Sequence, residues 1–108
     1  MSVRVSIAGR AEADLAHQYR WYLDNAGTGI AERFLISFDG TVARLVMNPQ
    51  LGRPRRFRAP ELAGIRSLPV RGSFGVHLVF YRVGERELSI ERVMHGARDL
   101  PRRLLEAP

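Results

Sequence analysis

The residues that could do chemistry are few, and arginine dominates them. The chain has 108 residues and 17 positive side chains, all of them arginine, against 11 acids, for a net charge of +6. It has no cysteine, which excludes disulfides, thiolate catalysis and cysteine-ligated metals. His17, His77 and His95 lack the short spacing of zinc ligands, and phosphate-cradling glycine loops are absent from the sequence. We therefore expect neither a metal site nor a cofactor.

The remaining possibility is phosphodiester cleavage without a metal, in which a ribose 2′-hydroxyl attacks its own phosphate. Such a site needs cations around the phosphate, together with a base and an acid that move protons. The arginines could supply the charge, and His77, Tyr81 and His95 are the candidates for proton transfer. Each candidate also has a structural interpretation: Tyr81 as a core or edge aromatic, His77 as a residue of the sheet surface, and His95 as a cap of local backbone.

The positive charge is concentrated in one third of the chain. Residues 49–82 contain seven arginines and the single acid Glu61, whereas the flanking thirds are each neutral. A localised basic field favours an acidic partner, such as nucleic acid or an acidic protein segment. A solvated arginine surface without a partner is the alternative.

Hydrophobic periodicity predicts the elements that must position these residues. Alternation over residues 3–7 predicts a short strand, and apolar steps of three and four residues predict helices over residues 10–25 and 31–46. The connection between the two helices is short, so we expect an antiparallel helical hairpin. Residues 49–60 contain three prolines and one glycine and are expected to be irregular.

The second half of the sequence predicts a meander of strands. Strands are expected over residues 65–68, 74–83 and 88–93, followed by a short C-terminal helix that Pro101 interrupts. The predicted fold class is α+β, in the order β-α-α-β-β-β, with a small antiparallel sheet packed by the hairpin. We expect residues 1–108 to form a single domain that is cytoplasmic and does not associate with a membrane, since the sequence contains neither a membrane-length apolar run nor a signal peptide.

The end of the sequence resembles a known family. Residues 90–100, Ile-Glu-Arg-Val-Met-His-Gly-Ala-Arg-Asp-Leu, are similar to the closing strand and tail of ParE-type toxins in the RelE/ParE superfamily. Further segments resemble the family in the same order: residues 13–15, 31–34, 49–53 and 65–70, followed by the strand of Tyr81. The resemblance covers nearly the whole chain and implies the toxin of a bacterial type II toxin–antitoxin pair, neutralised by a ParD-like or similar antitoxin.

Two activities occur in this superfamily, and the resemblance bears on the choice between them. RelE-like members are ribosome-dependent mRNA endonucleases, with a catalytic arginine on a strand and a tyrosine near the C-terminus. These positions align with Leu78 and Leu104, and Arg98 is the position that matches a nuclease arginine. We therefore expect a ParE-like inhibitor of DNA gyrase that acts as a binding protein rather than as an enzyme. The alternatives are a metal-independent endoribonuclease that acts on ribosome-bound mRNA through His77, Tyr81, His95 and Arg98, and a degenerate, non-toxic antitoxin-binding module.

Two sets of contacts follow from this hypothesis. The resemblance implies that the gyrase contacts lie in the last strand and tail, at Arg92, His95, Arg98, Asp99, Arg102 and Arg103. We expect the antitoxin to bind an apolar and basic surface at Trp21, Tyr22, Arg53, Arg55, Arg56 and Arg66. Trp21 lies off the apolar stripe of its helix, so we expect an exposed side chain there.

Overall fold

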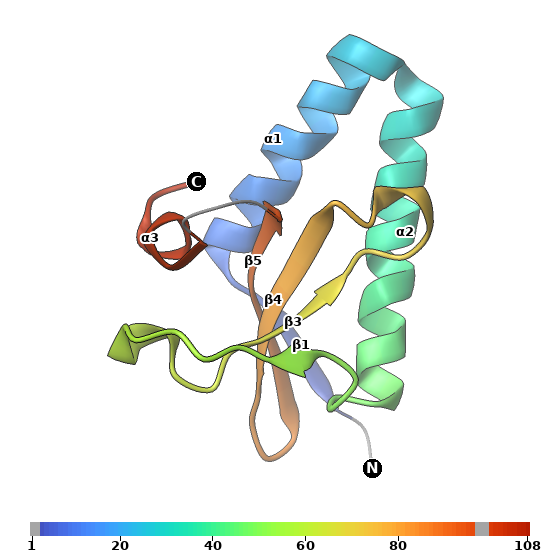
Figure 1. Cartoon of the computed structure of the whole chain (residues 1–108). Helices are drawn as coiled ribbons and strands as arrows, with labels where there is room; N and C mark the ends of the chain where they lie inside the picture. The colour runs from blue at the N-terminus through green and yellow to red at the C-terminus, as the bar shows by residue number, and fades with distance from the viewer. Residues whose placement is uncertain (1–2, 97–99) are drawn as a thin grey trace.

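The fold combines a helical hairpin, a five-stranded sheet and a short C-terminal helix (Figure 1). The hairpin and the C-terminal helix are as expected from the sequence, whereas the sheet has one strand more than the four that were predicted. A computed structural model describes residues 3–96 and 100–108. The elements are β1 (Arg4–Ile7), α1 (Gly9–Ala26), α2 (Thr28–Met47), β2 (Arg53–Pro54), β3 (Arg66–Pro69), β4 (His77–Val83), β5 (Glu87–His95) and α3 (Leu100–Leu105), with single 3₁₀ turns at Pro60–Leu62 and Gly72–Phe74. Among the described residues, the helices lack the combination of length and hydropathy that a membrane span requires.

A single residue joins the two long helices. Gly27 has φ of +94°, a conformation that glycine adopts at little cost, and its N–H donates to the carbonyl of Tyr22. The chain therefore reverses sharply, and α1 and α2 pack as the predicted antiparallel hairpin. The predicted apolar stripe of α2 is confirmed, since Ala31, Phe34, Phe38 and Leu45 are all buried.

The sheet is mixed rather than wholly antiparallel. Its strand order is β1-β5-β4-β3-β2, and the pairs β3–β4 and β4–β5 are antiparallel as predicted. The pair β2–β3 is also antiparallel, although the sequence did not predict β2. The first strand, however, pairs in parallel with the last, in a register that sets Arg4 beside Glu87. β5 therefore runs in the same direction as β1 and in the opposite direction to its other neighbour, β4.

A β-bulge in β5 changes which residues share a face. The register steps from Phe80–Arg92 to Tyr81–Ile90, leaving Glu91 without a partner in β4. Simple alternation along the strand places Arg92 on the face of Ile90, whereas the bulge moves Arg92 to the opposite face. Ile90 and Val93 consequently both point toward the hairpin and join its core.

Two apolar clusters hold the layers together. The larger cluster fills the space between the hairpin and one face of the sheet, and includes Phe34, Phe38, Val79, Tyr81 and Val93. The second lies on the other face, where α3 and the segment around Leu62 cover Phe80 and Met94. Pro101 is the second residue of α3 and does not interrupt it, in keeping with the tolerance of helix starts for proline. The expected irregular segment 49–60 contains one short strand, β2, at the edge of the sheet.

Candidate functional site

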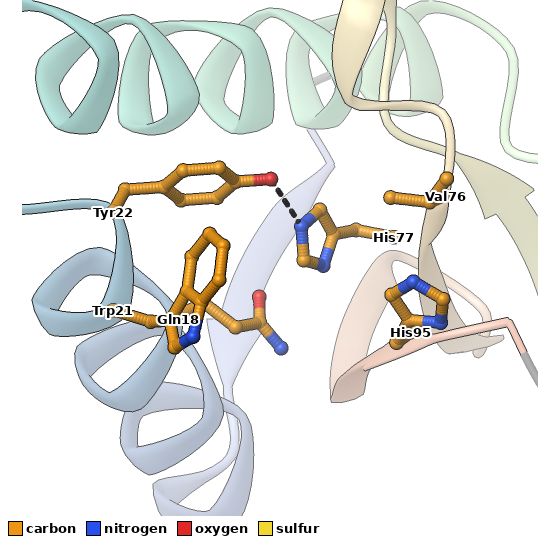
Figure 2. A pocket seen from close by; sticks show the side chains of 6 residues that line it. All are labelled: Gln18, Trp21, Tyr22, Val76, His77 and His95. Carbon is orange, nitrogen blue, oxygen red and sulfur yellow. Dashed lines mark hydrogen bonds between the residues drawn. The ribbon is translucent and has the colours of Figure 1, made fainter. Parts of the chain in front are cut away.

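A pocket lies where α1 passes the start of β4 and the end of β5. Its volume is about 510 Å³, and Figure 2 shows the side chains that line it. The lining residues are Gln18, Trp21, Tyr22, Val76, His77 and His95. Trp21 and Val76 are 59% and 51% exposed and form part of its rim. The expectation of an exposed Trp21 is confirmed.

The buried end of the pocket is a tyrosine–histidine pair. The Tyr22 hydroxyl lies 2.8 Å from His77 Nε2 (Figure 2). The His77 ring also packs against Phe34, with 4.9 Å between the two ring centroids. Burial, and secondarily the neighbouring charge of His95, lowers the pKa of His77 below its usual value. Burial also raises the pKa of Tyr22. Both groups are therefore uncharged near neutral pH, and the interpretation of His77 as a residue of the sheet surface is corrected.

Two polar atoms at this pocket are left without partners. The amide nitrogen of Gln18 donates to the carbonyl of Val93 over 2.6 Å. Its oxygen, Oε1, and the second ring nitrogen of His77, Nδ1, are both buried and have no hydrogen bond to the described part of the chain. Buried polar atoms are nearly always paired, so these two atoms distinguish the pocket from the rest of the described core. Sequence reasoning did not identify Gln18, since it lies on the polar flank of α1.

Tyr81 is a structural residue. Its side chain is fully buried, and its hydroxyl accepts the Gly52 N–H over 2.7 Å and donates to the Pro49 carbonyl over 2.8 Å. Burial raises the pKa of Tyr81, although the Gly52 hydrogen bond and the Arg66 charge oppose the shift. The expectation that Tyr81 could transfer protons to a substrate is corrected, because its hydroxyl is engaged in tying the 49–52 segment to β4.

Arg92 is likewise buried, at 4% exposure, and not available as a surface contact. Its Nε and Nη2 donate to the two carboxylate oxygens of Asp14 over 2.8 and 3.0 Å. Its Nη1 donates to the carbonyls of Leu104 and Glu106 over 3.1 and 2.7 Å. The bidentate pair joins β5 to α1, and the Nη1 bonds anchor the C-terminal segment to β5. The predicted role of Arg92 in target binding is therefore corrected.

The face of the sheet under α3 is filled with apolar side chains. Leu104 packs there with Phe80, Met94 and Leu100, and Leu78 lies against the same cluster. Leu78 and Leu104 are the positions at which the RelE-like nucleases are expected to carry arginine and tyrosine. Both positions therefore contribute to the same cluster, and both side chains there are apolar.

The other expected contacts in the tail are at the surface where the structure describes them. His95 and Arg102 are exposed and Arg103 is half-buried, with Arg102 paired to Glu106 over 3.2 Å. The Arg103 guanidinium donates to the His95 carbonyl over 3.3 Å, which brings the end of β5 and α3 together. Arg98 and Asp99 lie outside the described residues.

The basic segment divides into bound and exposed arginines. Arg66 donates to the carbonyl of Gly52 over 2.7 Å, and Arg55 donates to Ser67 while its guanidinium lies over the rings of Phe57 and Phe80. Burial, and secondarily Arg53, lowers the pKa of Arg55. Arg53 and Arg56 are exposed. This region and the pocket around His77 lie on different parts of the chain, and no single site unites the expected antitoxin residues within the described structure.

The described residues also include no group of three potential metal ligands.

This arrangement of hairpin, mixed sheet and C-terminal helix is the RelE/ParE toxin fold. A chromosomal ParDE toxin–antitoxin structure from Pseudomonas aeruginosa matches with a TM-score of 0.71 and 22% identity, over 89% of this chain and 98% of that one. The YoeB dimer of Staphylococcus aureus matches with a TM-score of 0.57 and 14% identity, over 90% and 100% of the two chains. A YoeB/ParE toxin from Agrobacterium tumefaciens gives 0.56 and 12%, over 88% and 100%.

The family follows from the sequence. The model of the ParE toxin family, the toxins of the parDE type II toxin–antitoxin system, matches residues 5–100. The chain belongs to this family, as its sequence motifs suggested. A search of curated proteins gives no significant match.

Proposed function

We propose that this ParE-family toxin inhibits DNA gyrase by binding it, without chemistry of its own. One observation carries the proposal: the positions equivalent to the nuclease arginine and tyrosine, Leu78 and Leu104, belong to an apolar cluster. A developing phosphorane charge would find no counter-charge in such surroundings. The hydroxyl of Tyr81 is fully engaged by Pro49 and Gly52, which removes a further candidate for proton transfer.

The gyrase contact surface in this proposal is the end of β5 together with α3. His95 and Arg102 are exposed there, and Arg103 links the two elements through the His95 carbonyl. The Arg92–Asp14 pair holds this surface in place from within. Since gyrase acts on chromosomal DNA, the proposed place of action is the cytoplasm.

The second partner in the proposal is a cognate antitoxin of the ParD type. Solved structures similar to this chain include a ParDE system and a YoeB–YefM complex, in which a toxin is accompanied by its antitoxin. Trp21 offers an exposed aromatic surface of the kind that dominates protein interfaces, and Arg53 and Arg56 offer charge for an acidic segment.

A supercoiling assay with purified gyrase tests the proposal. The toxin is expected to stop supercoiling and to accumulate cleaved DNA. The double variant His95→Ala/Arg103→Ala should weaken inhibition at least about tenfold, the loss expected for a few interface contacts. Arg33→Ala and Arg44→Ala, exposed positions on α2, are controls that should inhibit normally. Undisturbed supercoiling at toxin excess contradicts the proposal, and defined mRNA cleavages at translating ribosomes, seen by primer extension, would replace it with the endonuclease function.

A further inference from the structure

The pocket beside Trp21 combines aromatic and apolar walls with two buried polar atoms that have no partner among the described residues. Gln18 fixes the polarity of this site, because its amide nitrogen donates to the Val93 carbonyl and its oxygen is left as a buried acceptor without a partner among the described residues. Rotating the amide would set two oxygens against each other at 2.6 Å, which excludes the alternative orientation. Figure 2 shows the Gln18 carboxamide extending from α1 toward the space between Trp21 and His77.

His77 provides a second and adaptable polar atom. Its Nε2 is engaged by the Tyr22 hydroxyl, which can either donate or accept, so the buried Nδ1 can take the complementary role toward a ligand. His77 is 6% exposed, and the cost of leaving Nδ1 without a partner is correspondingly high. A phenol hydroxyl, which both donates and accepts, can satisfy Gln18 and His77 together, whereas an indole N–H satisfies Gln18 alone.

The lining also indicates what the ligand is not. In a chain with 17 arginines, none of the six described lining residues is an arginine, a lysine or an acid. A nucleotide phosphate is usually held by several cations, and apart from the exposed His95 and the buried His77 the lining offers no ionisable counter-ion, so an uncharged group fits this pocket best. Its aromatic and apolar walls, Trp21, Tyr22 and Val76, suit a planar apolar body.

We infer that this pocket receives an aromatic side chain of the antitoxin that carries a donor, the indole of tryptophan or the phenol of tyrosine. Its ring would pack against Trp21, and its N–H or O–H would bond to Gln18 Oε1. The inference rests on the antitoxin partner proposed above and is independent of gyrase. It adds the chemical identity of the anchoring group and the residue that selects it.

Indole and benzofuran, which have the same shape but differ in the N–H donor, provide the test. Titration into the free toxin, followed through the Trp21 indole and His77 ring signals in NMR spectra, should show indole binding roughly tenfold more tightly than benzofuran. Gln18→Met should remove this preference, and Gln50→Met, at an exposed position in a loop, should keep it. Trp21→Ala, which alters only an exposed side chain, should weaken the binding of both probes and covers the case in which Gln18→Met fails to fold.

The second part of the test uses the toxin–antitoxin complex. Indole should no longer bind to the preformed toxin–antitoxin complex, because the antitoxin side chain already occupies the pocket. Equal binding of the two probes, an unchanged preference in Gln18→Met, indole binding to the complex, or tighter binding of adenosine than of indole would each overturn the inference. A toxin that binds indole as described but leaves gyrase active would refute the proposed target alone.

Discussion

Two regions of the molecule treat their buried polar groups in opposite ways. Where α1, β5 and the C-terminal segment meet, Arg92 donates to both carboxylate oxygens of Asp14 and to the carbonyls of Leu104 and Glu106. At the hairpin end, Gln18 and His77 keep one buried polar atom each unpaired beside an open pocket. Pairing of these groups makes the first region a structural clamp, whereas the unpaired atoms of the second support the proposal that it binds a partner. In that proposal, the positions aligned with the nuclease residues serve packing, and recognition takes place elsewhere.

The clamp should be the most sensitive part of the molecule. Asp14→Leu leaves the buried Arg92 guanidinium without its carboxylate, which costs about 3–5 kcal/mol of unfolding free energy for a buried pair. Urea denaturation measures this loss. The Arg82–Glu91 pair is a matched control, since both side chains are about one third exposed, and Glu91→Gln should cost less than about 1 kcal/mol. Comparable losses at the two pairs would show that burial does not distinguish the clamp.

The contact between Gly52 and Tyr81 should come next. A Cβ at Gly52 would lie 2.4 Å from the Tyr81 hydroxyl oxygen and 2.6 Å from its ring, and the tyrosine is fully buried. Gly52→Ala should therefore destabilise the fold by about 1–3 kcal/mol, as overpacked cores do. Gly29→Ala is the matched control, because its Cβ would meet no atom within 4 Å and alanine is the better helix former. Equal melting temperatures for the two variants would contradict the structural role of Tyr81.

Features that depend on local sequence patterns could be predicted from the sequence. Features that depend on pairing between distant residues could not. Apolar steps located both long helices, and the position of Trp21 off the stripe predicted its exposure correctly. The partner of Arg92 could not be predicted in the same way, because Asp14 lies 78 residues away. One signal was present: Asp14 follows the buried Ala11 by three residues and therefore lies on the buried face of α1.

The bulge shows the same limit for the sheet. Alternation along residues 88–93 grouped Arg92 with Ile90, and one extra residue at Glu91 reversed that grouping. Bulges depend on the partner strand, so periodicity within one strand cannot reveal them. The parallel pairing of β1 with β5 was missed for a related reason, since short strands give no signal for their neighbours in the sheet.

The unpaired polar end of the pocket predicts a pH dependence. The pKa of His77 is lower in the folded chain than its unfolded value near 6.5, so the unfolded chain takes up the proton first as the pH falls. The unfolding free energy should therefore be unaffected by this group above about pH 6.5 and should decrease as the pH drops below that value. His77→Gln should lose this part of the decrease, and His17→Gln, at an exposed position, should retain it. Denaturation midpoints measured between pH 7.5 and pH 5 give the comparison.

A parallel profile in wild type and His77→Gln would show that the pocket exerts no such effect. His95 and Tyr22 face His77 and must be considered in that comparison, since their ring centroids lie 5.9 and 5.7 Å from its own. His95→Gln removes the second, smaller cause of the lowered pKa and should therefore reduce the slope without abolishing it.

The smallest effect on stability should come from the most prominent side chain of the pocket. Trp21 is 59% exposed, so Trp21→Ala should change the unfolding free energy by less than about 0.5 kcal/mol, as is usual at the surface. The same substitution should weaken antitoxin binding at least about tenfold, because exposed aromatic residues beside a pocket are typical interface hot spots. Calorimetric titration with the cognate antitoxin measures this, and Ile36→Ala, an exposed apolar position on α2, is the control. A large loss of stability would show that Trp21 is a packing residue. An unchanged affinity would show that Trp21 does not contribute to the antitoxin interface. A small loss of stability together with a large loss of affinity is the result expected for a residue that binds a partner. A residue that packs within the fold would show the opposite combination.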